Sequence, residues 1–147
     1  MKRLSVAVVL VLASGVASAG TDDIQCTSWV QEILEGSADA CSDLCPQAEQ
    51  FDHYDYRAGL EAAFASRQGL EHFLAYLGRS SIMGAGGEAH ACSVQALLVH
   101  WGDRRFATAL ARQSTKAREQ AIGLLDYAAT KNFQSRFPKT YQLASHE

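Results

Sequence analysis

Proline and alternating apolar–polar stretches are both scarce in this sequence. It has two prolines among 147 residues, and no stretch of useful length alternates apolar and polar side chains as a half-buried strand would. Apolar residues recur instead at helical spacing, and few prolines interrupt those patterns. We therefore expect an all-α fold, a single small disulfide-stapled domain of about five to six helices arranged as an irregular bundle or a short α-α superhelix.

The common motifs of metal, cofactor and nucleophile sites are also absent. The sequence has no H-E-x-x-H, no Glu-x-x-His pair, no C-x-x-C or C-x-x-C-H, no serine nucleophile elbow and no phosphate-binding glycine loop. These absences argue against zinc, di-iron, haem, redox-dithiol and nucleotide sites, so we expect no metal and no cofactor. The histidines are scattered, and each is expected at the surface or at a helix end: His53, His72, His90, His100 and His146.

The chain has a single long apolar run, near its start. Leu4–Ala13 follows two basic residues and precedes Ala17-Ser18-Ala19, which is the layout of a secretory signal peptide. About ten residues are too few to span a bilayer, which needs about twenty, so an N-terminal membrane anchor is the weaker alternative. No cysteine follows the run directly, which argues against a lipid anchor. We expect cleavage after Ala19, a mature chain that begins at Gly20, and a periplasmic or secreted protein.

Four cysteines remain in the predicted mature chain. An even number of cysteines in an exported protein indicates disulfides rather than free thiols or a metal site, and four cysteines allow three pairings. We favour Cys26–Cys45 and Cys41–Cys92, because a helix that carries Cys26 would fold back antiparallel after Gly36.

Glycines, serines and a proline mark the expected joints between helices. Gly36, Gly78 and Gly102 fit helix ends, Ser66 and Ser114 fit N-caps, and Pro46 fits the first position of a helix. The glycine-rich segment 79–87 is expected to be a loop. The helical domain is expected to cover 20–130, and a basic, aromatic segment over 131–147 is expected to pack onto it.

Two helix pairs share the same apolar spacing. Leu60, Ala63 and Phe64 match Phe106, Ala109 and Leu110, and Phe73, Leu74 and Leu77 match Ala121, Ile122 and Leu125. The offsets are close to the period of about 40 to 47 residues in HEAT and armadillo repeats. Leu60–Leu125 therefore resembles a short run of such helical hairpins, without a diagnostic motif. The resemblance implies a binding scaffold and no activity.

Charge is distributed unevenly along the predicted mature chain, whose net charge is −5. Residues 20–99 carry a net −9, and residues 100–147 carry a net +4. The two signs can simply neutralise each other in the fold, or the acidic half can steer a cationic partner toward it. An exported acidic protein is not expected to bind nucleic acid.

The densest polar cluster is the segment from Asp52 to Arg57. His53 could act as a general base that Asp52 or Asp55 orients, which would make the chain a small secreted hydrolase. The alternative is a polar helix start with half-buried tyrosines.

The loop at 79–87 offers a second candidate surface. Ile82 and Met83 are apolar residues in a polar, flexible setting, where they either plug the core or contact a partner. We expect partner contacts at Ile82, Met83, Glu49, Asp52 and Asp55.

Our first hypothesis is an exported, non-catalytic protein-binding module, an inhibitor or immunity protein that acts on a basic secreted or cell-wall-degrading enzyme. The alternative is the hydrolase with His53.

Overall fold

A computed structural model describes residues 21–144, with side chains from Gln25 onward. Its secondary structure is helical, and no strand occurs within that range. The predicted all-α, disulfide-stapled domain is therefore confirmed. The elements are α1 (Thr21–Leu34), the 3₁₀ helix η1 (Asp39–Cys41), α2 (Leu44–Asp52), α3 (Tyr56–Ala65), α4 (Arg67–Leu77), α5 (Ala85–Ala111), α6 (Thr115–Tyr127), α7 (Phe133–Arg136) and α8 (Pro138–Gln142).

The structure has more helices than the sequence predicts. Eight α-helices and one 3₁₀ helix occur in the described residues, against an expectation of five to six. The excess includes α7 and α8, single-turn helices in the C-terminal segment that are too short to produce a periodic apolar pattern. The predicted signal peptide and its cleavage site lie outside the described residues, and the domain boundaries stay a prediction.

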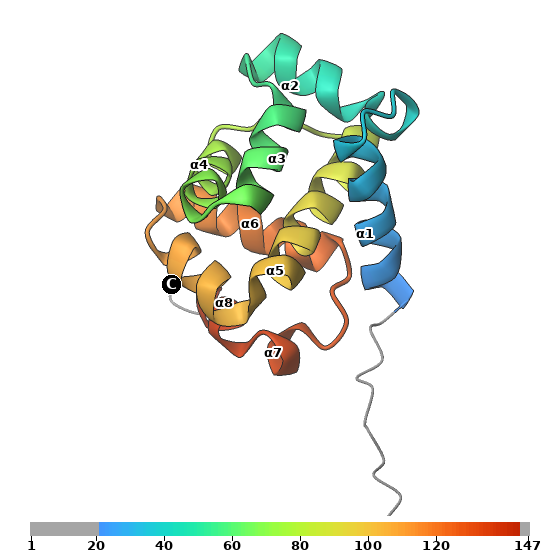
Figure 1. Cartoon of the computed structure of the whole chain (residues 1–147). Coiled ribbons are helices and arrows are strands. Elements are labelled where there is room, and N and C mark those ends of the chain that lie inside the picture. The colour runs from blue at the N-terminus through green and yellow to red at the C-terminus, as the bar shows by residue number, and fades with distance from the viewer. Residues whose placement is uncertain (1–20, 145–147) are drawn as a thin grey trace, which may run out of the picture.

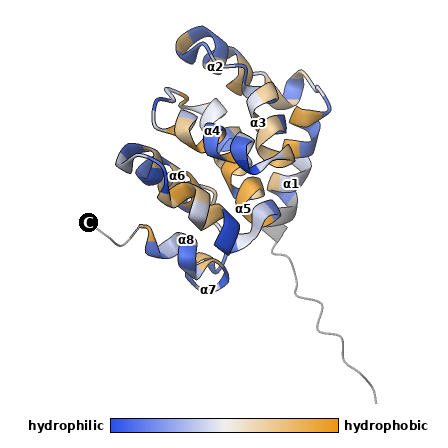
Figure 2. Ribbon diagram, turned by 60° about the vertical axis from the view of Figure 1, so that its left-hand side comes forward, coloured by the Kyte–Doolittle hydropathy of each residue, from blue (hydrophilic) through white to orange (hydrophobic). Residues whose placement is uncertain are grey.

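Helix α5 is the central element of the fold. It contacts α1, α2, α3, α4, α6 and α8, and Figure 1 shows these helices arranged around it, with α2 across one end and α7 and α8 at the other. Hydrophobic and hydrophilic stretches alternate along the helices in Figure 2, and the buried hydrophobic residues form a core between the helices. The largest fully buried side chains come from α1 to α5: Tyr56, Phe73, Phe106, Ile33, Leu44, Leu60, Leu70, Leu74, Leu77, Leu97, Leu98 and Leu110.

The predicted joints agree with the local backbone. Gly36 adopts a positive φ of 89° just after α1, a conformation that favours glycine. Ser66 and Ser114 accept hydrogen bonds from the amides of Gly69 and Ala117 and so cap α4 and α6. Pro46 lies in the first turn of α2, where its missing N–H breaks no helical hydrogen bond.

Gly102 divides α5 into two helical parts that meet at a kink. Its φ of 72° and ψ of 160° are not helical, as the predicted helix end at this residue requires. The carboxylate of Asp103, the next residue, accepts hydrogen bonds from the amides of Lys139 (2.9 Å) and Thr140 (2.8 Å). This side chain therefore satisfies the first turn of α8 and joins the C-terminal segment to α5.

The expected cysteine pairing is wrong. The disulfides are Cys26–Cys92, with a Cα–Cα distance of 4.8 Å, and Cys41–Cys45, with a Cα–Cα distance of 5.3 Å. Helix α1 contacts η1, which follows it, but its main packing partner is α5, and this packing places Cys26 beside Cys92. The chain between α1 and α2 turns tightly through η1, and this turn brings Cys41 beside Cys45.

The loop at 79–87 is shorter than expected. Helix α5 begins at Ala85, so the glycines at 86 and 87 belong to its first turn. The segment that follows Leu77 and precedes Ala85, hereafter the 78–84 loop, lies alongside α2, and its position depends on the polar contacts described next.

Candidate functional site

The polar cluster at the end of α2 is divided between the inside and the outside of the protein. Asp52 is the last residue of α2 and is only 7% exposed. His53 follows with a left-handed backbone (φ 51°, ψ 46°), so the chain turns away and the His53 side chain is exposed. Neighbours in the sequence therefore face different surroundings in the fold.

Asp52 anchors the 78–84 loop. Its carboxylate accepts hydrogen bonds from the Tyr76 hydroxyl (2.6 Å), from the Ser81 amide (3.1 Å) and from the Ser81 hydroxyl. Burial alone would raise the pKa of this carboxyl, but the hydrogen bonds from Ser81 and Tyr76 and the charge of Arg79 outweigh it and hold the pKa below its usual value. Asp52 is therefore an ionised, internally bound group and not an exposed contact.

Aromatic rings and an arginine extend this anchor. Tyr54 and Tyr76 stack with a centroid distance of 3.7 Å and an interplanar angle of 9°. The Arg79 guanidinium lies 5.2 Å from the Tyr76 ring centroid, and its Nη1 donates to the Asp52 carbonyl at 2.7 Å. Burial raises the pKa of Tyr54 to about 12, although Arg79 acts in the opposite direction. One arginine thus joins the loop to the end of α2.

His53 and Asp55 are not joined by a hydrogen bond or an ion pair in the described residues. Asp55 is the N-cap of α3 and accepts from the Ala58 amide at 3.0 Å. No hydrogen bond or ion pair between His53 and either Asp52 or Asp55 is present in the described part of the chain. The side chains of His53 and Asp55 are exposed and, together with Glu49, line an open hollow of about 460 Å³. The arrangement lacks the base–orienter contact that proton transfer by His53 would use.

A buried histidine was missed by the sequence analysis. His90 is 3% exposed, and a hydrogen bond of 2.8 Å joins its Nδ1 to the Tyr56 hydroxyl. Burial lowers the pKa of His90 to about 4, against the opposing charge of Asp52. The signal was present: His90 precedes Val94 by four residues and Leu97 by seven, so it belongs to the apolar face of its helix.

The remaining histidines are peripheral. His72 is exposed, and the His100 Nε2 contacts the Phe64 carbonyl at 3.2 Å. His146 lies outside the described residues. Among residues 21–144 no group of three or more His, Cys, Asp or Glu side chains is arranged to hold a metal ion.

The two apolar residues of the 78–84 loop have different roles. Ile82 is half-buried and packs against the core, whereas Met83 is 72% exposed. The Gln47 side chain forms two hydrogen bonds with the Met83 backbone, donating to its carbonyl (3.2 Å) and accepting from its amide (3.1 Å). Phe51, one helical turn after Gln47 on α2, is 61% exposed. Gln47 and Phe51 share one flank of α2, and Gln47 holds the Met83 backbone beside that flank, so Phe51 and Met83 both lie there with their side chains open to solvent.

Comparisons with known proteins identify no relative. No protein-family model, curated protein or solved structure matches this chain. The resemblance of Leu60–Leu125 to HEAT and armadillo hairpins therefore rests on apolar spacing and stays a prediction. Within the described residues, no helix is long and apolar enough to cross a bilayer.

Proposed function

We propose that this chain is an exported, non-catalytic protein-binding module that inhibits, or confers immunity to, a basic secreted or cell-wall-degrading enzyme. The observation that supports this most strongly is the pair of solvent-exposed apolar side chains, Phe51 and Met83, on a loop and helix fixed by hydrogen bonds. A loop held in one conformation loses little entropy on binding, and exposed Phe and Met side chains are enriched at interface centres.

Helix α2 presents two different flanks to a partner. Successive helical residues are rotated by about 100°, so Gln47 and Phe51 lie on one flank, whereas Cys45 and Glu49 lie on the other. Phe51 and Met83 make the first flank apolar. Glu49 and Asp55 line the hollow on the second flank together with His53 and Arg57, so the flank has two carboxylates and one guanidinium. We call these two flanks together the α2–loop surface; Asp52 supports it from beneath.

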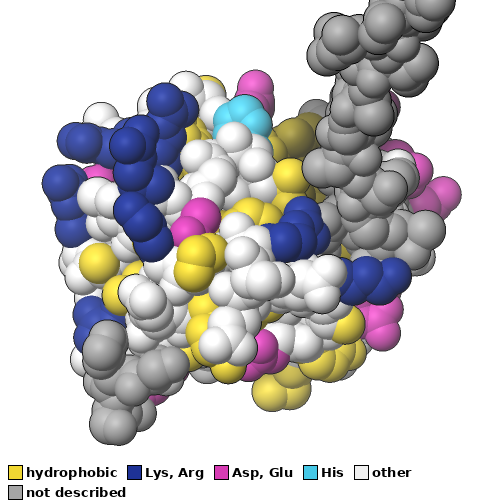
Figure 3. Space-filling view, turned by 90° about the horizontal axis from the view of Figure 1, so that it is seen from below, with side chains coloured by type: hydrophobic (Ala, Val, Ile, Leu, Met, Phe, Trp, Pro, Cys, Tyr) yellow, Lys and Arg dark blue, Asp and Glu magenta, His cyan; other side chains and the backbone are white. Residues whose placement is uncertain are grey.

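Charge favours a basic partner at this surface. No Lys or Arg occurs between Arg3 and Arg57, while carboxylates on η1, α2 and the turns beside them are exposed: Asp39, Asp43, Glu49 and Asp55. The nearest guanidinium groups, on Arg57 and Arg79, point to backbone carbonyls of α1 and α2. Seen from the α7 and α8 side, away from α2, Lys and Arg side chains gather on one part of the surface (Figure 3). Such a separation of charge orients a cationic protein during encounter.

Affinity capture with substituted surfaces tests the proposal. The purified exported chain is immobilised and exposed to the proteins of the extracytoplasmic fraction at low and moderate salt. We expect a stoichiometric basic enzyme to be retained, to lose activity on binding, and to be released by Phe51→Ser/Met83→Ser. Tyr127→Ser removes an equally exposed aromatic side chain (62%) from α6 and should leave capture unchanged.

The outcomes separate the two hypotheses. Capture that survives Phe51→Ser/Met83→Ser, or no stoichiometric partner at either salt concentration, would count against a binding module at this surface. Hydrolytic activity that His53→Ala abolishes without loss of stability would instead support the alternative hydrolase.

A further inference from the structure

A second hollow, of about 570 Å³, lies on the opposite, basic half of the chain. It is bordered by the end of α5, the first two turns of α6 and the residues that follow α8. This volume is within the range of small-molecule sites, which is about 300–1,000 Å³. The hollow shares no residue with the α2–loop surface, so the inference below is independent of the proposed function.

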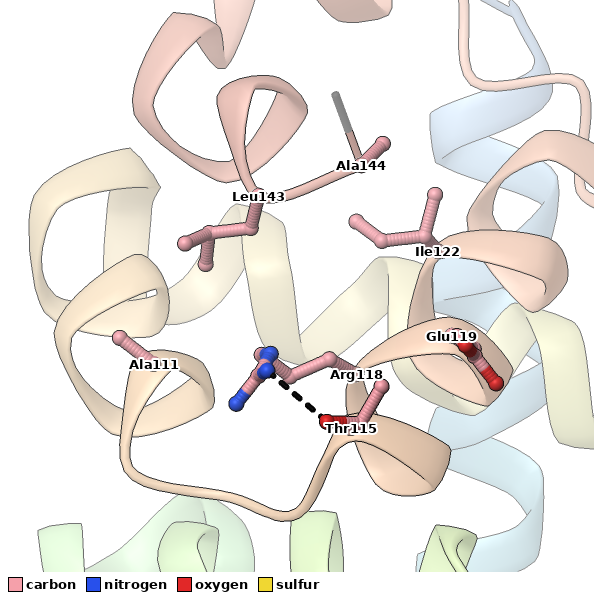
Figure 4. A pocket seen from close by; sticks show the side chains of 7 residues that line it. All are labelled: Ala111, Thr115, Arg118, Glu119, Ile122, Leu143 and Ala144. Carbon is pink, nitrogen blue, oxygen red and sulfur yellow. Dashed lines mark hydrogen bonds between the residues drawn. The ribbon is translucent and has the colours of Figure 1, made fainter. Parts of the chain in front are cut away.

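One side of the hollow is formed by a fixed arginine. The Arg118 Nη1 donates to the Gln113 carbonyl at 2.7 Å, and its Nη2 donates to the Thr115 hydroxyl oxygen at 3.2 Å. These two bonds use two of the five N–H groups of a guanidinium, and the others remain for a ligand. Figure 4 shows the guanidinium extending from α6 toward Ala111, across the hollow.

The opposite side is apolar. Ile122 and Leu143 lie across from the guanidinium in Figure 4, and both also pack against the hydrophobic core. Glu119, the acidic residue of the lining, is turned away from Arg118 in the same view. The hollow therefore has a cationic side and an aliphatic side.

The charges of α6 are opposite to those that folding favours. The first turn of α6 has no acidic residue, whereas its second and fourth residues are Lys116 and Arg118. The N-terminal end of a helix is the positive end of its dipole, where anions are stabilising and cations are not. The carbonyl of Gln113, just after α5, accepts from Arg118 and compensates part of its charge; local violations of this kind are found at functional positions, and a bound anion would compensate the rest.

We propose that this hollow binds a small amphipathic carboxylate. The head group lies at Arg118 and Thr115, and the alkyl part lies against Ile122 and Leu143. A planar guanidinium matches the two oxygens of a carboxylate. Arg118 is the single Lys or Arg of the lining, and Glu119 is its single acidic residue, so the lining favours a ligand with one negative charge over a phosphate monoester with two.

Calorimetric titration with decanoate, decanol and acetate tests both sides of the hollow. We expect decanoate to bind, decanol to bind at least about tenfold more weakly because it lacks the charge-assisted hydrogen bond, and acetate to give no measurable binding. Arg118→Gln should weaken decanoate by about tenfold or more and leave decanol unchanged. The control Arg105→Gln removes an exposed charge of α5 from outside the lining and should change neither affinity by more than about twofold.

Leu143→Gln tests the aliphatic side separately and should weaken decanoate and decanol alike. Thermal melting shows that each variant is folded, and Leu143→Gln decides the proposal should Arg118→Gln not fold. Equal affinity for decanoate and decanol in the native protein, equal decanoate affinity in the Arg118→Gln and Arg105→Gln variants, or unchanged binding in Leu143→Gln would overturn the proposal.

Discussion

The Tyr76 hydroxyl donates a hydrogen bond of 2.6 Å to the buried carboxylate of Asp52. This contact joins the end of α2 to α4, and Ser81 adds the 78–84 loop to the same carboxylate. The sequence suggests that Asp52 orients His53, but in the fold its carboxylate accepts hydrogen bonds from Tyr76 and Ser81 instead. The same network fixes the loop that carries Met83, so the stability of the fold and the shape of the proposed binding surface depend on one side chain.

Asp52→Asn should destabilise the protein. The substitution removes the negative charge and turns one acceptor into a donor that faces buried donors, which costs about 2–4 kcal/mol in the free energy of unfolding. Urea denaturation followed by circular dichroism measures the change. The matched control is Asp55→Asn, which should be nearly neutral because Asn is as good an N-cap as Asp. Equal effects of the two substitutions would show that the Asp52 carboxylate does not hold the loop.

Helix ends were predictable because their chemistry is local. Ser66, Ser114 and Gly36 act within one helical turn of their own position, so the sequence contains the whole signal. Gly102 is a further example. A helix end was expected there and its backbone is not helical, although a second helical part begins directly at Asp103. The role of Asp103 was not predictable, because its carboxylate accepts hydrogen bonds from the first amides of α8, a helix that begins 35 residues later.

Contacts between distant elements were not predictable. The Cys26–Cys92 link depends on α1 packing against α5, which no local pattern specifies. The relative placement of His53 and Asp52 was hidden for a related reason: the left-handed backbone of His53 directs its side chain away from the buried Asp52, which adjacency in the sequence does not reveal. The sequence left open whether Met83 plugs the core or contacts a partner; its exposure and the hydrogen bonds of its backbone with Gln47 are visible only in the fold.

The buried His90 should make the protein less stable in acid. The pKa of His90 is about 4 in the folded state and about 6.5 in the unfolded chain, so the unfolded chain binds the additional proton between these values. The free energy of unfolding is therefore not reduced by His90 above pH 6.5. It decreases as the pH falls toward 4, and the loss from this group reaches about 3 kcal/mol. Melting temperatures measured from pH 7.5 to 4.5 should decrease accordingly.

Substitution isolates this contribution from other titrating groups. His90→Gln should flatten the decrease over the same pH range, although it also lowers stability at neutral pH because the Tyr56 hydroxyl loses its partner. The exposed His53 serves as control, and His53→Gln should keep the native pH profile. An unchanged profile in His90→Gln would mean that other groups produce the acid sensitivity.

Two helical glycines should respond to alanine in opposite directions. A Cβ at Gly69 in α4 would collide with the backbone carbonyl of Ala62 in α3, whereas a Cβ at Gly123 in α6 would meet nothing within 4 Å. Gly69→Ala should therefore destabilise by about 1–3 kcal/mol through overpacking. Gly123→Ala should stabilise by about 1 kcal/mol through higher helix propensity. Chemical denaturation measures both, and stabilisation by Gly69→Ala would contradict the close approach of α3 and α4.

The two disulfides should contribute unequally to stability. Cys26–Cys92 closes a loop with a sequence separation of 66, and Cys41–Cys45 closes one of 4. Because a crosslink restricts the unfolded chain more when its loop is longer, Cys26→Ser/Cys92→Ser should cost about 4 kcal/mol and Cys41→Ser/Cys45→Ser about 2 kcal/mol. Denaturation of the two double variants under oxidising conditions gives the difference. Non-reducing peptide maps identify the remaining bond in each variant. Equal losses would mean that the α1 and α5 segments remain in contact in the unfolded chain. The long crosslink would then restrict that chain no more than the short one.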